Sequence, residues 1–209
     1  MAQENSNKEK LQQNLENVLN SALEIIKNPI GFFQMMPKSG GYIEPLIFLV
    51  IVSAAAAVIQ IALGIIGIGY NGGVMTLLSL IIFVPFFNAV FGFVGAAALY
   101  IIWKIMGSEE NYETAFRCGA YTAAIVPVVA VVDMIPYLGT FIKIGWTVYL
   151  LVIASSVVHK IKQNTAWVVF GVIGIFLLFS SLSVQSKARK AQETVGEMLK
   201  GLQQSEELD

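Results

Sequence analysis

Residues 74–104 read VMTLLSLIIFVPFFNAVFGFVGAAALYIIWK, and the first charged side chain after Val74 is Lys104. A helix of about 18 or more apolar residues, rising roughly 1.5 Å per residue, crosses a hydrocarbon core of roughly 30 Å. One helix over residues 74–106 would extend about 50 Å, so we expect it to tilt, to bend near Pro85 or to begin in the interface. This stretch predicts a membrane-spanning helix.

The sequence contains four further apolar stretches, and its composition is typical of an integral membrane protein. Of 209 residues, 56% are hydrophobic and 13% are charged, against roughly 25% charged in an average soluble domain. Mean hydropathy is +0.70. We predict an all-α membrane protein, a five-helix transmembrane bundle with amphipathic N-terminal and C-terminal helices. Its 13 basic and 14 acidic residues give no basic surface for nucleic acid.

Three regions follow from the hydropathy pattern. Residues 1–42 form an N-terminal amphipathic and interfacial segment, residues 43–184 the transmembrane domain and residues 185–209 a polar tail helix. Short turns between spans predict antiparallel neighbours. Tryptophans near span ends are expected at headgroup level; they are Trp103, Trp146 and Trp167. The predicted spans cover about residues 44–66, 74–106, 112–135, 139–161 and 165–184.

Both terminal segments have apolar residues at helical spacing. The N-terminal helix is expected to start after residue 7 and to end before Asn28-Pro29. Residues 30–36 then predict a short segment at the headgroup boundary. The tail has the spacing of a helix that lies on the membrane or pairs with another chain, or of a solvated terminal helix. Its apolar positions are Ala188, Ala191, Val195, Met198 and Leu202.

Lysine and arginine predict the orientation. A cytoplasmic N-terminus places eight of them inside, namely Lys8, Lys10, Lys27, Lys38, Lys104, Arg117, Lys160 and Lys162. Five fall outside, namely Lys143, Lys187, Arg189, Lys190 and Lys200. The excess favours an N-terminus in the cytoplasm, although the basic cluster after the last span favours the opposite.

Polar side chains at membrane depth are the candidate functional residues, because a charge in lipid is costly unless it is paired or hydrated. Arg117 follows Glu113 by four residues, which predicts a local ion pair. Asp133 and Lys143 flank a tight turn at 136–139, which predicts an ion pair between the third and fourth spans, with a functional relay or substrate contact as the alternative. The candidates within or beside the spans are Glu44, Asn88, Arg117, Asp133 and Lys143, of which Asn88 predicts an interhelical hydrogen bond.

Catalysis has little support in the sequence. His159 is the only histidine, and Ser155 lies four residues before it on one predicted helical face. No oxyanion hole or third orienting group accompanies the pair. We therefore expect no enzymatic activity, no cofactor and no metal site.

Several motifs recur in a recognisable order. Before and into the first span stand Asn28-Pro29, Phe32-Phe33, Met36-Pro37 and Tyr42-Ile43-Glu44-Pro45-Leu46; later come Phe116-Arg117, Gly119-Ala120-Tyr121, Pro127 and His159-Lys160. The order and spacing resemble the Yip domain family (Ypt-interacting proteins). The resemblance implies a five-helix bundle with a cytoplasmic N-terminus, and it adds Tyr121 and His159 to the candidate residues.

Eukaryotic members of that family are associated with vesicle trafficking and small prenylated GTPases. The eukaryotic motif of an acidic residue followed by Leu-Tyr-Gly-Pro survives here only as Glu44-Pro45, so the chain is more similar to the bacterial branch. This implies a multi-pass protein of the bacterial inner (cytoplasmic) membrane.

Two functional hypotheses follow. The first is a non-enzymatic Yip-type protein that acts in membrane organisation or trafficking, surrounded by the lipid bilayer and working through membrane protein partners, with a second copy of the chain among the candidates. The alternative is a small transporter, channel or lipid-moving protein that uses its intramembrane polar residues.

Overall fold

The computed structural model describes residues 2–66, 74–135 and 137–206, and every regular element in these ranges is a helix. The first two helices are α1 (Ala2–Lys27) and α2 (Pro29–Met35). They are followed by α3 (Ile43–Ile65), α4 (Val74–Ile105), α5 (Tyr112–Tyr121), the 3-10 helix η1 (Thr122–Ile125), α6 (Val126–Val132), α7 (Leu138–Val157) and α8 (Gln163–Glu206).

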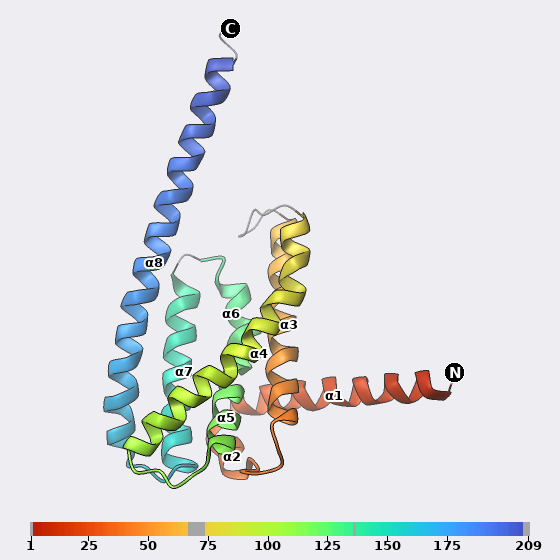
Figure 1. Ribbon diagram of the computed structural model, residues 1–209, viewed down its shortest axis with the longest axis vertical. Coiled ribbons are helices and arrows are strands. Elements are labelled where there is room, and N and C mark those ends of the chain that lie inside the picture. Colours follow the sequence, from red (N-terminus) through yellow and green to blue (C-terminus); the bar gives the residue numbers. More distant parts are fainter. Residues whose placement is uncertain (1, 67–73, 136, 207–209) are drawn as a thin grey trace.

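Five stretches of the described chain are long and apolar enough to cross a membrane. They are Ile43–Ile65, Ser79–Ile105, Tyr112–Val132, Leu138–Val157 and Gln163–Ala191. In Figure 1, the axes of α3, α7 and α8 are roughly aligned, with α7 antiparallel to the other two, and α4 crosses them obliquely. The predicted all-α membrane bundle is confirmed.

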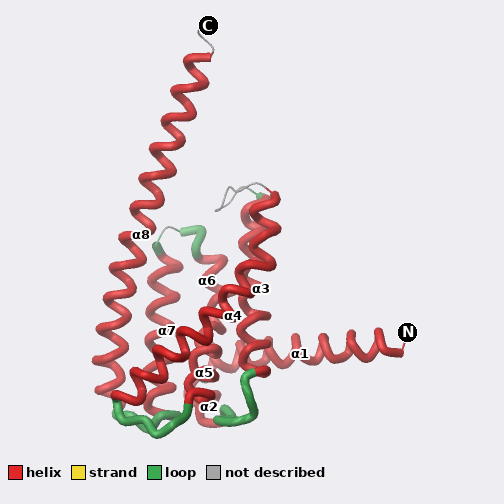
Figure 2. Tube along the Cα trace, viewed as in Figure 1, coloured by secondary structure: helices red, strands yellow, loops and turns green. Residues whose placement is uncertain are grey.

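The connecting loops gather at the two ends of the bundle. Figure 2 shows the loops before α3, between α4 and α5 and between α7 and α8 at the end where α2 also lies. The turn from α6 to α7 lies at the other end, and α8 continues past it (Figure 1). Five crossings therefore place the N-terminal and C-terminal helices at opposite ends of the bundle.

The third span is not the single helix that its hydropathy predicts. It consists of α5, the 3-10 turn η1 and α6, and Pro127 stands in the first turn of α6. Proline lacks the N–H that would continue the α-helical ladder, and a short 3-10 stretch absorbs the interruption. Pro85, in contrast, lies inside the continuous helix α4.

The last span and the tail form one helix, α8, rather than a span followed by a separate tail helix. Similarly, α1 already begins at Ala2, so part of the N-terminal segment expected to precede the helix belongs to it. Asn28 ends α1 and caps α2, because its side-chain oxygen accepts a hydrogen bond from the backbone N–H of Gly31 at 3.1 Å.

Helix α2 anchors the N-terminal region to the bundle. Phe33 is 2% exposed and Met36 is 6% exposed, and both belong to the main hydrophobic core. These two side chains therefore pack against protein, whereas the predicted interfacial segment would place them against lipid headgroups. Ile30 and Met35 are the large apolar side chains of this segment that remain exposed.

Candidate functional site

Arg117 lies at the centre of a polar cluster where α5 meets the start of α3. Its Nη1 lies 3.2 Å from Glu44 Oε2, its Nη2 donates to the carbonyl of Gly41 at 2.9 Å, and its Nε lies 3.5 Å from Glu113 Oε1. The predicted contact with Glu113 is confirmed. However, the Arg117 side chain is only 1% exposed, so the cluster is a buried feature and not an ordinary surface pair.

Glu113 connects this cluster to the loop before α3. Its Oε1 accepts a hydrogen bond from the backbone N–H of Gly41 at 2.7 Å. Gly40 and Gly41 have φ angles of +125° and +86°, which L side chains rarely adopt. The Glu113 carboxylate therefore fixes a loop conformation that glycine makes accessible. Because α3 begins directly after this loop, the loop also sets the position of Glu44 beside Arg117.

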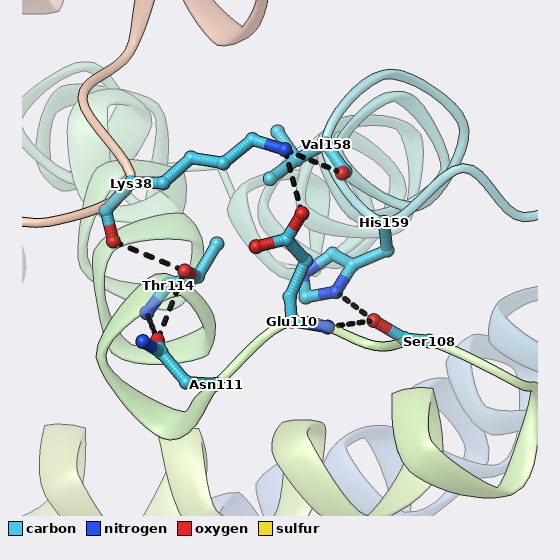
Figure 3. A network of polar contacts seen from close by, with 7 residues as sticks. All are labelled: Lys38, Ser108, Glu110, Asn111, Thr114, Val158 and His159. Atoms are coloured by element: carbon cyan, nitrogen blue, oxygen red, sulfur yellow. Dashed lines mark hydrogen bonds and ion pairs between the residues drawn. The ribbon is translucent and has the colours of Figure 1, made fainter.

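A second polar network, centred on Lys38, ties together three loops at the same end (Figure 3). Lys38 Nζ lies 2.6 Å from Glu110 Oε1 and donates to the carbonyl of Val158 at 3.3 Å. Thr114 Oγ1 donates to the carbonyl of Lys38 at 3.1 Å. The loops before α3, α5 and α8 are thus held together by one lysine.

His159 extends this network into the core. Its Nδ1 lies 2.7 Å from Ser108 Oγ in Figure 3, and its ring stacks on Trp103 with centroids 3.9 Å apart. His159 follows α7, outside the spans. Burial lowers the pKa of His159 to about 4, so the ring is neutral at pH 7.

Ser155 and His159 do not form the helical pair that their spacing indicated. Helix α7 ends at Val157, so His159 is not on the helical face of Ser155. Ser155 Oγ instead accepts a hydrogen bond from Trp103 Nε1 at 2.8 Å and donates to the carbonyl of Leu151 at 2.6 Å. Trp103 is 1% exposed, so its ring is surrounded by protein.

Tyr121 is a buried ring of the core close to the arginine cluster. It is 4% exposed and makes edge contacts with Phe32 and Phe48, each with centroids 4.9 Å apart. It also borders a cavity of about 270 Å³ between α1 and α3 that Glu44 lines. The structure therefore brings Glu44, Arg117 and Tyr121 together, although Glu44 belongs to a motif far from the other two in the sequence.

Asp133 and Lys143 lie at the opposite end of the bundle, away from the other candidates. In the part of the chain that the structure describes, the ion pair predicted between them is not formed. Both side chains instead line a cavity of about 490 Å³ between α7 and α8.

Asn88 does not bridge two helices. Its Nδ2 donates to the carbonyl of Val84 in its own helix at 3.0 Å, and the side chain is exposed on α4. The predicted interhelical hydrogen bond is wrong, because a one-turn bond within the helix satisfies the amide instead.

No group of three or more His, Cys, Asp or Glu side chains that could hold a metal ion occurs among the described residues. Cys118 is fully buried. The candidate residues near α5 are engaged with one another and with backbone carbonyls, an arrangement that holds loops in place.

The match to a family model decides the identity of the chain. The model of the Yip1 domain matches residues 23–183, a range that contains all the polar clusters above except the end of the α8 cavity. The chain belongs to the Yip1 domain family. No curated protein and no solved structure matches it. It is a multi-pass membrane protein of Yip type.

Sequence reasoning on this Yip1 domain missed the network around Lys38. Its partners Ser108 and Glu110 stand in the short polar segment before α5, where a solvated loop is the default expectation, and Thr114 stands in the first turn of α5. The sequence contains one signal near this network, a helix N-cap. Asn111 precedes Thr114 by three residues, and its Oδ1 accepts a hydrogen bond from the backbone N–H of Thr114 at 2.9 Å. That cap marks the start of α5 but does not identify the distant partners.

Proposed function

We propose that this Yip1-domain protein is a non-enzymatic organiser of the membrane that engages a membrane protein partner through α1. The observation that carries the proposal is the exposed apolar surface of α1. Four leucines form a stripe along it at steps of four residues, and they are 59%, 45%, 60% and 41% exposed. We call this the leucine stripe; its members are Leu11, Leu15, Leu19 and Leu23.

The leucine stripe is separate from the surface that attaches α1 to the bundle. Val18 and Ile25 are buried in the main core, and they occupy a neighbouring strip of the same helix. Helix α1 lies across the direction of α3 and its N-terminal part projects beyond the bundle (Figure 1). The apolar surface is thus presented at the end of the spans, where a partner in the same membrane can cover it.

We propose further that α1 lies in the cytoplasm, in a bacterial inner membrane. Seven of the eight basic residues assigned to the inside belong to α1, to the loops at its end of the bundle and to the end of α4, and the eighth, Arg117, lies within α5. The excess of eight over five supports this orientation.

The competing transport hypothesis receives less support from the geometry. The cavity that holds Asp133 and Lys143 reaches along α7 only to Ile144, in the second turn of that helix, whereas transporter sites typically lie near the bilayer midplane. Asn88, the third residue of that hypothesis, bonds back to its own helix.

Replacing Leu11, Leu15 and Leu19 by serine is expected to abolish capture of the partner after crosslinking in native membranes. The three side chains are exposed, so the variant keeps Val18 and Ile25 in the core and should accumulate like the wild type. The measurement is quantitative mass spectrometry of proteins crosslinked to the wild-type chain and to the variant. This design avoids deleting α1, which would remove core residues.

The matched control replaces Gln13 and Asn20, exposed residues on the polar face of α1, by serine. It should retain the partner at the wild-type level. If the leucine variant and the control recover the same partner equally, or if the wild type recovers none above an unrelated membrane protein, the proposal is refuted.

A further inference from the structure

The cavity at the end of α7 combines both signs of charge. It has a volume of about 490 Å³ and lies between the first turns of α7 and residues 181–189 of α8. Asp133, Lys143 and Arg189 are its charged lining residues, and Thr140 and Gln185 face it from α7 and α8. Its volume falls within the range of roughly 300–1,000 Å³ typical of small-molecule sites.

The position of the cavity corresponds to the edge of the membrane. The apolar stretch of α7 begins at Leu138 and that of α8 ends at Ala191, and the lining residues fall at 139–144 and 181–189 on these helices. A cavity at this level faces lipid headgroups.

One of the two basic side chains that line the cavity, Arg189, is held in place by an aromatic ring. The guanidinium of Arg189 lies over the ring of Tyr137, 4.8 Å from its centroid. Gln185 Nε2 donates to Thr140 Oγ1 and so links the two helices beside it. Among the described residues, no ion pair joins Asp133 to either cation.

Asp133 has a defined place in the lining of the cavity. A Cβ at Gly139 would overlap Asp133 Oδ1, so the carboxylate rests directly against the backbone of the first turn of α7. Only glycine leaves room for it there. The cavity therefore presents a carboxylate at a fixed position together with two cationic groups.

We propose that this cavity binds the headgroup of a zwitterionic phospholipid of the phosphatidylethanolamine type. Lys143 and Arg189 bind the phosphodiester, since basic side chains make charge-assisted hydrogen bonds to phosphate oxygens. Asp133 accepts hydrogen bonds from the ammonium group, which has three donors. One negative and one positive charge on the ligand thus meet the charges of the opposite sign in the cavity.

The surroundings favour a lipid over a free phosphate compound. A second hollow shares Tyr137 with the cavity and is lined by Phe141, Phe179 and Leu182. Phe141 is 49% exposed and Phe179 is 67% exposed, so apolar surface borders the charged groups. An amphiphile satisfies both surfaces, whereas a soluble phosphate would leave the apolar one uncovered.

The test is native mass spectrometry of the full chain in detergent with three added probes: dioleoyl phosphatidylethanolamine, dioleoyl phosphatidylglycerol and soluble phosphoethanolamine. We expect the wild type to retain phosphatidylethanolamine in preference to both others. The double variant Lys143→Gln with Arg189→Gln should lose about tenfold or more in affinity for it. Asp133→Asn should lower the preference for phosphatidylethanolamine over phosphatidylglycerol.

Lys187→Gln is the matched control, because Lys187 is an exposed cation on the same helix that does not line the cavity. It should bind phosphatidylethanolamine like the wild type. Three results would each overturn the inference: equal binding by the double variant and the wild type, equal retention of soluble phosphoethanolamine and the lipid, or equal wild-type binding of the two lipids. None of these results bears on the partner of α1, which rests on different residues.

Discussion

Replacing Arg117 by leucine is expected to lower the free energy of unfolding by about 3 kcal/mol. The arginine is 1% exposed and binds Glu44, Glu113 and the carbonyl of Gly41. Its loss leaves the largely buried Glu113 carboxylate and the Gly41 carbonyl without the guanidinium that they contact. Unfolding of the purified variant in mixed detergent micelles, compared with the wild type, measures the effect.

Glu44→Gln provides the comparison for this prediction. The Glu44 side chain is 66% exposed, so water can replace much of its contact with Arg117, and we expect a loss below about 1 kcal/mol. If Arg117→Leu were no more destabilising than Glu44→Gln, the buried cluster would not hold the loop before α3 in place.

Acidification from pH 7 to pH 5 is expected to destabilise the protein through His159. Burial lowers the pKa of His159 to about 4, with Lys38 and Lys104 also lowering it and Glu110 opposing them. The unfolded chain, with an ordinary histidine pKa of about 6.5, binds the proton first. The stability from the neutral ring is therefore complete above about pH 6.5 and is lost as the pH falls toward 4; about 2 kcal/mol is lost at pH 5.

His159→Asn separates this effect from the titration of the carboxylates. Asparagine keeps a polar group near Ser108 but has no proton to gain in this range. The variant should be less stable at pH 7, because the stacking on Trp103 is lost, yet its stability should fall less between pH 7 and pH 5. Equal falls for variant and wild type would show that His159 is not the group that titrates.

Hydropathy predicts which stretches cross the membrane, because the apolar composition of a stretch decides whether lipid or water surrounds it. It does not predict where helices stop. The change from apolar to polar residues falls between Ile175 and Val195, and no proline or glycine stands in that stretch. Helix α8 therefore continues through the change. Conversely, Pro127 interrupts the third span while its composition stays apolar.

Local spacing predicts local contacts of the candidate site and little more. The pair of Glu113 and Arg117 lies one helical turn apart and follows from the sequence. Glu44 is 73 residues from Arg117, and Ser108 is 51 residues from His159, so only the packing of the helices brings them together. Trp103 and its hydrogen-bond partner Ser155 likewise belong to different helices.

Labelling of single cysteines by a membrane-impermeant maleimide tests the central claim, a five-span bundle with α1 in the cytoplasm. Cys118 is buried, so a Cys118→Ala chain is a suitable background for Glu109→Cys in the loop before α5 and Lys187→Cys on α8; both positions are exposed. The account predicts that intact spheroplasts label Lys187→Cys, and that Glu109→Cys reacts only after the membrane is opened. Labelling of both cysteines from the same side would contradict it.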